Sequence, residues 1–460
     1  MIDNNKHPSK GLFSRITRLF RTPDASPESS SDSPIIPRSQ HNISRENISE
    51  NALKVLYRLH KAGYQACLVG GGVRDLALGL EPKDFDVATN AEPEEVKALF
   101  RNCRLIGRRF RLAHVFYGRD IIEVATFRGG GDPTTDDDQI SHSDEGRILR
   151  DNVYGTIEED AMRRDFTINA MYYDIKNFSV LDYMAGMRDI KQGVLRIIGD
   201  PDQRYREDPV RMLRVVRFAV KLGFSIHPQT EQPVFELSEL LGDISPSRLF
   251  DESVKLFMSG QALQTFEMLR HYGLFAYLYP LTEKALSVEE FDFPLMLVAQ
   301  AMKNTDERLQ SGKSVTPAFI YAALLWEPVR QLAERITQEE DLPEFPAMQK
   351  AVAKVLQQQS SHTAIPRRFS MFMREVWQLQ GRFDFMTGMR PYKLLTHPRF
   401  RAAYDFLLLR AGCGEVSEQT GEWWTRFQEA GSSERKKMTR PVKKTGKKKQ
   451  RTPGEQPKNN

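Results

Sequence analysis

Residues 68–89 read LVGGGVRDLALGLEPKDFDVAT, a glycine-rich segment followed closely by two aspartates. Asp84 and Asp86 are two positions apart, and alternate side chains of an extended chain share one face, so both carboxylates are expected to point the same way. One or two carboxylates together with substrate phosphates are the ligands that Mg²⁺ prefers. The segment therefore predicts metal-assisted phosphoryl or nucleotidyl transfer. The alternative is a pair of loop acids that cap a turn.

The glycines at 70–72 are a weak signal alone, because three glycines can mark any tight turn. Here they precede Arg74, Asp75 and the paired aspartates, and the combination is specific. The backbone amides of Gly70 and Gly71 are free to approach a triphosphate, and Arg74 offers a planar guanidinium to its oxygens. We expect Asp75 to orient Arg74 rather than to contact a substrate.

Two further acids are candidates for a third catalytic carboxylate, because two-metal sites need carboxylates that converge on both ions. Glu123 lies in an apolar strand, where an unpaired charge is costly. Asp165 directly follows two arginines. Each acid has a structural alternative: an ion pair with an arginine for Glu123, and a bridge to Arg163 or Arg164 for Asp165. The sequence leaves open which of the two completes the site.

The composition is that of a globular protein with several domains. The chain has 460 residues and a mass of 52.9 kDa, more than one core usually supports. With 40% hydrophobic and 28% charged residues and a mean hydropathy of −0.50, it is expected to be soluble. Its three cysteines (Cys67, Cys103 and Cys413) lack metal-binding spacing, which fits a reducing compartment. No secretory signal or membrane-spanning apolar run is visible, so we expect a cytoplasmic protein.

Positive charge is concentrated at the C-terminus. The formal net charge is +5, yet ten lysines and arginines lie between Arg435 and Arg451 with no acid among them, which leaves about −5 for the rest. We expect residues 431–460 to be a disordered basic tail that attracts phosphate backbones in a salt-sensitive way. The lysines expected to contact RNA are Lys443, Lys444, Lys447, Lys448 and Lys449. The alternative is a tail that serves solubility.

The first 40 residues are expected to be a low-complexity lead, since residues 26–37 are rich in serine and proline. Within the lead, apolar residues recur at helical spacing over residues 12–21, with basic residues between them. A short basic amphipathic helix is able to contact an anionic membrane surface. Partial membrane association is therefore a hypothesis, and inert disorder is the alternative.

Residues 41–199 are predicted to form a mixed α/β head. The pattern predicts a helix from Ser49 to Gly63 and a buried strand at 66–69 that enters a glycine turn. Further predicted elements are helices at 73–78 and 93–100 and strands at 85–89, 112–117 and 121–127. Residues 129–146 are rich in glycine, aspartate and serine and are predicted to be a surface loop.

After residue 200 the pattern becomes helical almost throughout. One helix is predicted to have Asp208 as its N-cap, Pro209 as its first residue and Gly223 as its stop. Further helices are predicted at 246–259, 262–271, 315–325, 347–358, 369–380 and 400–409. We interpret residues 200–260 as a helical neck and residues 261–430 as a helical body and tail.

Three segments together resemble a known family: residues 68–86, residues 163–169 (RRDFTIN) and residues 207–214 (EDPVRMLR). In combination they are similar to the class II nucleotidyltransferases of the DNA polymerase β superfamily, which comprise CCA-adding enzymes and bacterial poly(A) polymerases. The resemblance is strong over residues 40–260 and more diffuse over the helical remainder. It implies an α/β nucleotidyltransferase head, followed by an all-α neck, body and tail between disordered termini.

The resemblance also implies roles for residues of the first segment. Gly71 and Arg74 would hold the triphosphate of ATP. Asp84 and Asp86 would bind two Mg²⁺ ions.

The other two segments would contact the rest of the nucleotide. The resemblance implies that Arg164 and Asp165 sense the ribose 2′-hydroxyl, and that Asp208, Arg211 and Arg214 read the base by hydrogen bonds. Arg211 and Arg214 are three residues apart and share a helix face. The alternative for this segment is a capped helix with solvated arginines, and capping by Asp208 competes with base reading for the same carboxylate.

Finer likenesses separate polyadenylation from CCA addition. Residues 105–115 (LIGRRFRLAHV), with Arg108 and Arg109 as expected RNA contacts, are similar to a segment that marks bacterial poly(A) polymerases. Residues 41–45, residues 399–405 and the basic tail share this likeness. A tail that binds arbitrary RNA suits an enzyme that extends many transcripts.

The resemblance therefore implies template-independent transfer of AMP from ATP to RNA 3′-hydroxyls, with release of pyrophosphate by a two-metal mechanism, in RNA processing and decay. The RNA-decay machinery is an expected partner. One alternative is a CCA-adding tRNA nucleotidyltransferase, which would also use CTP. Another is a non-catalytic RNA-binding adaptor, which the presence of Asp84, Asp86 and Glu123 disfavours.

Overall fold

The computed structural model describes residues 34–107, 111–129, 140–142, 148–151, 153–287 and 293–440. The chain divides into two compact units. The first unit comprises Met1–Lys284, Met302–Val315 and Gln358–Ala364, and the second comprises Ala285–Ala301, Thr316–Gln357 and Ile365–Asn460. Helix α14 (Phe293–Gln310) contributes to both units, so they are interleaved in sequence.

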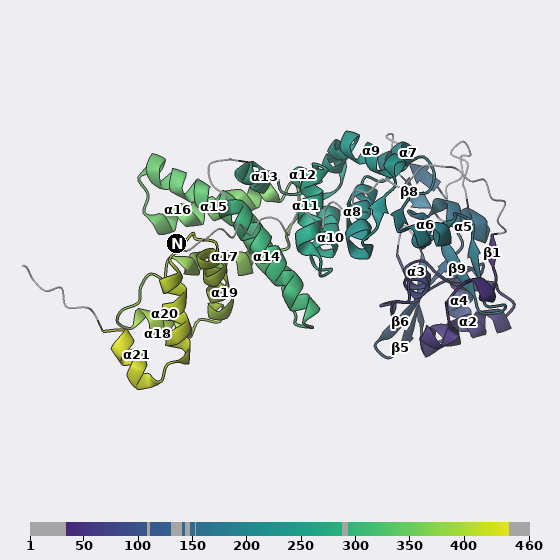
Figure 1. The fold of residues 1–460 in the computed structure, drawn as a ribbon, viewed down its shortest axis with the longest axis horizontal. Coiled ribbons are helices and arrows are strands. Elements are labelled where there is room, and N and C mark those ends of the chain that lie inside the picture. The colour runs from purple at the N-terminus through teal and green to yellow at the C-terminus, as the bar shows by residue number, and fades with distance from the viewer. Residues whose placement is uncertain are drawn as a thin grey trace, which may run out of the picture. The chain divides into compact units, whose positions relative to one another are not determined.

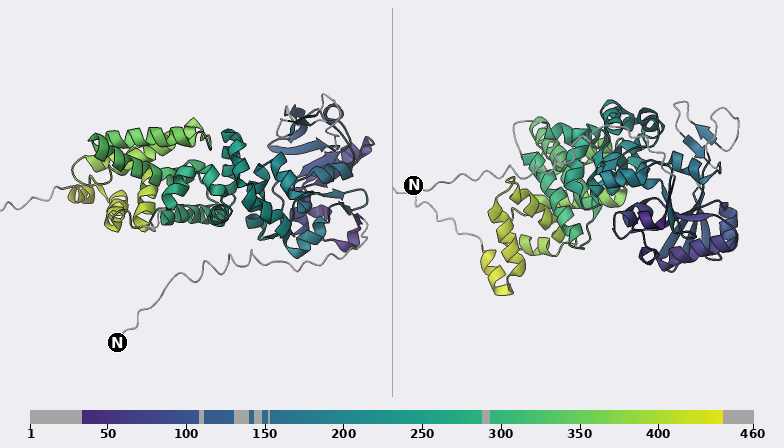
Figure 2. Two further views of the ribbon diagram at one scale, coloured as in Figure 1. Left: turned by 90° about the horizontal axis from the view of Figure 1, so that it is seen from above. Right: turned by 45° about the vertical axis from the view of Figure 1, so that its right-hand side comes forward.

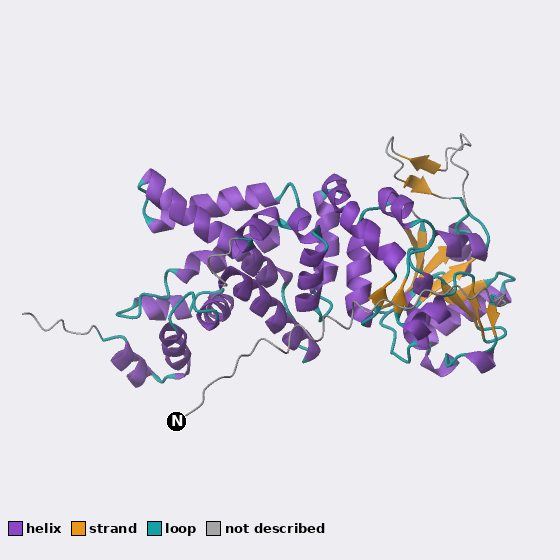
Figure 3. Ribbon diagram, turned by 45° about the horizontal axis from the view of Figure 1, so that its top comes forward, coloured by secondary structure: helices purple, strands orange, loops and turns teal. Residues whose placement is uncertain are grey.

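An eight-stranded mixed sheet forms the centre of the head, and Figure 3 shows its strands in orange. The strand order is β1-β10-β9-β2-β3-β6-β5-β4, in which β3 and β6 run parallel and the other neighbours run antiparallel. The strands are β1 (Ile35–Ile36), β2 (Ala66–Val69), β3 (Asp86–Thr89), β4 (Cys103–Ile106), β5 (Leu112–Tyr117), β6 (Asp120–Thr126), β9 (Met171–Asp174) and β10 (Ser179–Asp182). The parallel pair in mid-sheet aligns Asp86 with Glu123.

Helices of the head pack on this sheet (Figure 1). They are α2 (Glu50–Lys61), α3 (Gly71–Ala77), α4 (Pro93–Leu99) and α5 (Ile157–Arg163), whereas α6 (Gly186–Gln192) packs against α3 and against the strand at Val194–Leu195. Helix α2 shows why the sequence folds this way: the side chain of Ser49 accepts a hydrogen bond from the amide of Ala52, which caps the first turn. Its buried residues, Ala52, Val55, Leu56 and Leu59, recur at helical spacing and face β2, β3 and β6.

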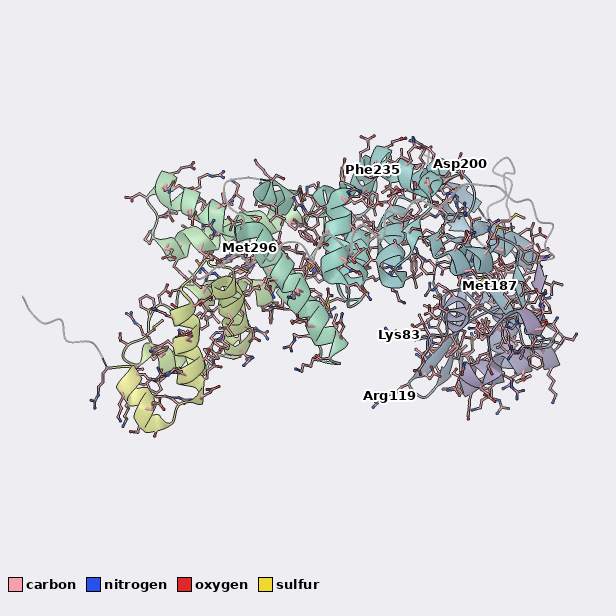
Figure 4. All side chains as sticks on the ribbon, in the orientation of Figure 1. Lys83, Arg119, Met187, Asp200, Phe235 and Met296 are labelled. Carbon is pink, nitrogen blue, oxygen red and sulfur yellow. The ribbon has the colours of Figure 1, made fainter. Side chains whose placement is uncertain are left out.

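The neck and the first helices of the body follow the head, and up to Lys284 they belong to the first unit. Figure 2 shows these helices in teal beside the blue strands of the head. The neck contains α7 (Pro201–Glu207), α8 (Val210–Leu222), α9 (Pro228–Glu236) and α10 (Pro246–Phe257), and the body begins with α11 (Ala262–His271), α12 (Leu274–Leu278) and α13 (Pro280–Leu286). A short parallel pair, β11 (Val194–Leu195) and β12 (Ser225–Ile226), joins the end of the head to the residues that follow α8. Figure 4 labels Asp200, the residue that caps the first turn of α7.

The second unit is helical in its described residues. Besides part of α14 it contains α15 (Pro317–Glu340), α16 (Glu344–Gln359), α17 (Arg367–Gln380), α18 (Arg390–Leu395), α19 (Phe400–Gly412), α20 (Glu418–Glu429) and α21 (Ser432–Met438). Buried tryptophans hold the helices together: the indole of Trp377 donates to the Ala322 carbonyl at 3.1 Å, and that of Trp424 donates to the Phe383 carbonyl at 2.8 Å. None of the helices in the described part of the chain has the length and hydropathy needed to cross a bilayer.

Ordered secondary structure extends into both the predicted N-terminal lead and the predicted C-terminal tail. The expected lead reached residue 40, but Ile35 and Ile36 pair with Leu181 and Val180 and extend the sheet at its edge. Two consecutive isoleucines supply enough apolar surface for an edge strand even in a serine- and proline-rich context. At the other end the expected disordered tail began at residue 431, whereas α21 is helical. The amphipathic helix predicted at residues 12–21 lies outside the described residues.

Two predictions inside the head also need correction. The expected surface loop at 129–146 contains strand β7 (Ile140–His142), which pairs with β8 (Ile148–Asp151). The helix predicted to start at Val73 begins two residues earlier, at Gly71. Tertiary packing explains the second difference, because two glycines that have low helix propensity are held in the helix by the close neighbours described below.

Candidate active site

The glycine segment starts a helix rather than forming a separate turn. Gly70, the N-cap of α3, has φ +73° and ψ −134°, a conformation that side chains with a Cβ strongly resist. Gly72 lies so near the following loop that an added Cβ would meet the carbonyl oxygen of Asp84 at 3.3 Å. The glycines therefore bring the end of β2 and the start of α3 against the loop that carries Asp84.

Arg74 is buried, and its guanidinium is bound to neighbouring side chains. Its side chain is 3% exposed, and its Nε and Nη2 donate to Asp75 Oδ1 at 2.8 and 2.6 Å. Its Nη1 donates to Asn169 Oδ1 at 2.7 Å. The expectation that Asp75 orients Arg74 is confirmed. Arg74 does not line the large cavity described below, and neither do Gly70 and Gly71.

Three carboxylates lie near one another at the strand edge, where the charges of Glu123 and Asp84 act on Asp86. Asp86 is the first residue of β3, Asp84 precedes it by two residues in the loop, and Glu123 is the register partner of Asp86 on β6. Burial, and then the charges of Glu123 and Asp84, raise the pKa of Asp86 to about 6. Within the described part of the chain, neither aspartate forms an ion pair or a side-chain hydrogen bond. Asp84 and Asp86 therefore lack an ion-pair partner among the described residues, although the charges of Arg164 and His114 partly oppose the rise in the pKa of Asp86.

This donor set fits Mg²⁺, although it is not a complete cage. Among the described residues, no three His, Cys, Asp or Glu side chains are grouped so that they could hold a metal ion. Mg²⁺ commonly takes one or two carboxylates and draws its other oxygens from water and substrate phosphates. Asp84 and Asp86 match that pattern, and a cation would relieve the repulsion that disfavours ionised Asp86.

Glu123 has a histidine partner rather than the arginine that was considered. Its Oε2 lies 3.4 Å from His114 Nε2 on the adjacent strand β5. The Glu123 side chain is 42% exposed, so the apolar strand does not bury it as the sequence suggested. Glu123 nevertheless remains the acid whose charge acts most strongly on Asp86.

Asp165 pairs with the neck instead of with its neighbours. Its Oδ2 accepts hydrogen bonds from Arg214 Nε at 2.8 Å and from Arg214 Nη2. Its Oδ1 accepts from the Phe166 amide at 2.9 Å and from Asn169 Nδ2 at 3.2 Å. The considered bridge to Arg163 or Arg164 is therefore wrong, and Asp165 joins the head to α8.

Arg164 belongs to a network that the sequence did not reveal. Its Nη2 and Nε donate to Asp160 Oδ2 at 2.9 and 3.2 Å, and its Nε also donates to the Tyr172 hydroxyl at 2.9 Å. The Tyr172 hydroxyl in turn donates to Asp160 Oδ2 at 2.6 Å. The spacing of Asp160 and Arg164, four residues apart on a helix, was a usable signal. Tyr172 carried none, because it comes from β9.

The start of α8 carries the residues expected to read the base. The Asp208 carboxylate accepts from the Val210 amide at 3.3 Å and from Arg248 Nη2 at 2.8 Å. The expected cap is thus partly confirmed, although the helix itself begins at Val210 and Pro209 is its N-cap. Arg211 Nη1 donates to Glu207 Oε2 at 2.8 Å. Both oxygens of Asp208 are occupied, so a base that Asp208 reads would have to replace one of these two partners.

A cavity of about 430 Å³ lies between the strand edge and the neck. Seven arginines and seven acids are among its lining residues: Arg128, Arg163, Arg164, Arg204, Arg211, Arg214, Arg248, Asp86, Glu123, Asp160, Asp165, Glu207, Asp208 and Glu252. The structure therefore brings together the predicted residues Asp86, Glu123, Arg164, Asp165 and the three of α8. Such a lining is suited to a nucleotide bound together with cations, because the arginines can bind its phosphates and the acids can bind the cations.

Several cavity residues were missed at the sequence level. Arg204 donates through Nη2 to the carbonyls of Arg163 and Arg164 at 2.8 and 2.7 Å, and it pairs with Glu207. Arg248 comes from α10, and no local pattern marks it. The predicted RNA contacts Arg108 and Arg109, and the five lysines of the tail, lie outside the described residues.

Comparisons with known proteins identify the family. A model described as "Poly A polymerase head domain" matches residues 66–196. Models described as "Probable RNA and SrmB- binding site of polymerase A" and "Polymerase A arginine-rich C-terminus" match residues 223–286 and 340–458. Poly(A) polymerase I of Salmonella typhi is 51% identical over 407 residues, which cover 88% of this chain and 88% of that protein. The chain belongs to the poly(A) polymerase I family.

More distant similarity extends to enzymes that act on tRNA. The CCA-adding enzyme of Bacillus subtilis is 38% identical over 251 residues, which cover 54% of this chain and 61% of that enzyme. A solved structure named "tRNA-processing enzyme (apo form 2)" shares the fold, with a TM-score of 0.55 at 23% identity over 84% of this chain and 100% of that chain. Full-length similarity to poly(A) polymerase I thus exceeds the similarity to CCA-adding enzymes, and the expected fold and family are confirmed.

Proposed function

We propose that the cavity is the ATP site of a polynucleotide adenylyltransferase that adds AMP to RNA 3′ ends without a template. Membership of the poly(A) polymerase I family supports the activity. The observation that carries the site assignment is the alignment of Asp86 with Glu123 on one wall of a cavity whose other wall is α8. This arrangement sets metal-binding oxygens opposite guanidinium groups, with room for a nucleotide between them.

We assign the strand edge to the reacting phosphate. Asp84 and Asp86 would hold Mg²⁺, with Glu123 as the third carboxylate, because Glu123 acts on Asp86 whereas Asp165 is bound to Arg214. When bound, the ions lower the pKa of the attacking 3′-hydroxyl and neutralise charge on the leaving pyrophosphate. The protein contributes by holding these carboxylates close together, already positioned for the reaction, before the substrate binds.

We assign the neck to the nucleoside. Arg214 and Asn169 fix the Asp165 carboxylate, which would lie near the ribose. Asp160 and Tyr172 fix Arg164 in the same way. Asp208 and Arg211 present hydrogen-bonding groups to the base. Because these groups are already paired in the free chain, they are pre-oriented, and binding exchanges partners instead of ordering loose side chains. We retain Gly71 and Arg74 as the triphosphate end of the site.

Incubation of the purified protein with a generic RNA and each of the four nucleoside triphosphates separately tests the proposal. We expect extension by ATP, with CTP, GTP and UTP poorly used. Comparable use of CTP, together with a preference for tRNA that lacks its terminal CCA, would instead indicate CCA addition. No extension by any nucleotide, with RNA binding intact, would indicate an adaptor.

We also propose the wider setting. RNA is held by the neck, since the family model over residues 223–286 is described as an RNA- and SrmB-binding site, and the basic tail adds contacts to RNA backbones. A protein of the RNA-decay machinery is the proposed partner of that neck. We place the protein in the cytoplasm, with residues 12–21 contacting anionic membrane surfaces. Flotation with anionic liposomes tests that contact, and equal flotation after deletion of residues 1–22 would reject it.

A further inference from the structure

Three arginines surround one phenylalanine at the junction of head and neck. The guanidinium carbons of Arg74, Arg214 and Arg217 lie 5.2, 5.6 and 4.8 Å from the ring centroid of Phe218. The rings of Phe218 and Phe166 form a T-shaped pair, with centroids 5.5 Å apart. Phe218 therefore acts as a platform that gathers three positive charges, each attracted by the ring face.

Two of these arginines have acidic partners, and the third has none among the described residues. Asp75 binds Arg74, and Asp165 binds Arg214. Within the described part of the chain, Arg217 forms no ion pair, and its buried Nε has no hydrogen-bond partner. A buried donor without a partner costs free energy, so its presence calls for a function or a missing ligand.

The acids that influence Arg217 do not neutralise it. Burial, and then the charge of Arg214, lower the pKa of Arg217, while Glu252 and Asp165 act in the opposite direction. Glu252 is bound to Lys255 at 2.7 Å, and Asp165 is bound to Arg214. Both acids are therefore already committed to other cations.

Two lysines extend the same positive region. Lys221 lies one turn beyond Arg217 on α8 and is exposed, but partial burial of its ammonium lowers its pKa, and Arg74, Arg217 and Lys83 add positive charge against the acid Asp75. Lys83, labelled in Figure 4, immediately precedes Asp84. Charges from α3, α8 and the metal-binding loop thus act on one another at this junction.

We propose that Arg217 and Lys221, supported by Lys83, form a phosphate-binding site beside the catalytic carboxylates. A guanidinium with a free donor, one helical turn from an ammonium, matches the geometry and charge of a phosphate group. The inference rests on the proposed function, which supplies two phosphate sources, the β- and γ-phosphates of ATP and the backbone of the RNA primer. A purely structural Arg217 stacked on Phe218 would explain the ring contact but not the adjoining unpaired lysine.

The test compares Arg217→Gln and Lys221→Gln with Arg206→Gln. Arg206 is a suitable matched control, because it is an exposed neck arginine paired with Asp202 on α7. Pyrophosphate binding in the presence of Mg²⁺ is measured by calorimetry, the KM for ATP by AMP incorporation, and the Kd of a labelled oligoadenylate by fluorescence anisotropy at several salt concentrations. Melting temperatures report folding.

If the site binds a phosphate of ATP, each variant weakens pyrophosphate binding and raises the KM for ATP, both on the order of tenfold to a hundredfold, because one charge-assisted hydrogen bond is lost. The Kd for RNA then stays unchanged. If the site binds a phosphate of the RNA backbone, the Kd for RNA rises, and the slope of log Kd against log salt concentration falls by about one. Pyrophosphate binding then stays unchanged. Either result supports the site. Values within twofold of Arg206→Gln in all three measurements overturn it.

Two provisions keep the outcome decisive. Should Arg217→Gln melt at a clearly lower temperature, Lys221→Gln decides alone, since Lys221 is exposed on the helix surface. Should the wild-type protein incorporate no AMP, the proposed function fails, while calorimetry with pyrophosphate still shows whether this phosphate site exists.

Discussion

The strand edge of β3 and β6 and the start of α8 face the same cavity, but they hold their charges in different states. On the strand edge Asp86 forms no ion pair with any described residue, and burial with the charges of Glu123 and Asp84 raises its pKa to about 6 against the opposing charges of Arg164 and His114. On α8 Arg211 and Arg214 are each bound to an acid. The comparison indicates that acids repel one another at the strand edge, where a bound cation would lower that repulsion, whereas ion pairs already hold the arginines of α8 in position.

The largest expected effect comes from removing the strained charge. Asp86→Asn should lower kcat for AMP incorporation on the order of 10³-fold or more, because a metal ligand is lost at the reacting centre. It should not lower the melting temperature in EDTA, because the neutral amide removes repulsion from Glu123 and Asp84. Primer-extension kinetics and thermal melting measure both.

Asp120→Asn is the matched control, since Asp120 is an exposed acid at the start of β6. It should leave kcat unchanged. If Asp86→Asn retained activity within tenfold of wild type, the strand edge would not be the metal site and the comparison would break.

The next effect is on stability and concerns the paired arginine. Arg214→Ala should lower the free energy of unfolding by roughly 3 kcal/mol, because it leaves the buried Asp165 carboxylate without its partner. Urea unfolding measures this loss. Arg206→Ala, which removes a solvent-exposed arginine from α7, should produce no measurable change.

The same pair carries a pH signature. Burial raises the pKa of Asp165, but the charge and hydrogen bonds of Arg214 outweigh it and hold the pKa below the ordinary 3.8. Asp165 therefore stabilises the fold above pH 3.8, and this contribution disappears as the pH falls through the lower folded-state pKa. The stability difference between wild type and Arg214→Ala should shrink over that window. A difference that is constant with pH would contradict the pairing.

Glu123→Gln sharpens the comparison on the strand side. We expect kcat to fall on the order of tenfold to a hundredfold, because Glu123 supports the metal-binding pair from the adjacent strand. His114→Gln, which removes the ion-pair partner of Glu123 and keeps its carboxylate, should be far less impaired. Equal values of kcat for the two variants would show that Glu123 serves only in a surface ion pair with His114.

The smallest effect concerns nucleotide choice. Asp208→Ala should reduce the ratio of kcat/KM for ATP to that for CTP by about tenfold, the value of one hydrogen bond to the base. Asp202→Ala on the exposed side of α7 should leave the ratio unchanged. An unaltered ratio in Asp208→Ala would show that its bonds to Val210 and Arg248 are structural.

Elements built from local spacing were predictable. Helix α2, strands β5 and β6 and helix α11 were predicted to within one or two residues, because capping, glycine stops and apolar period act between neighbours in the chain. Helix α15 shows the limit: it was predicted to end at residue 325 but continues through Pro328 to Glu340. Packing of its buried face outweighs the local penalty of an internal proline.

The candidate site divides in the same way. The sequence identified the acids of the strand edge and the arginines of α8, because their spacing and residue types are unusual enough to mark chemistry. It could not identify the partners of these residues. Asp165 and Arg214 are 49 residues apart, and Asp208 and Arg248 are 40 apart, so no local pattern links either pair.

By itself, the sequence determined that acids, glycines and arginines suited to nucleotidyl transfer are present, and in which local elements they lie. The tertiary structure alone decided that Asp86 lies beside Glu123 with no ion-pair partner among the described residues, and that Arg74 is buried and bound to Asp75 and Asn169. It also decided that Arg217 forms no ion pair within the described part of the chain. The physical reason is that backbone preferences act over a few residues, whereas the pairing of charges depends on which distant surfaces meet when helices and sheet bury their apolar faces.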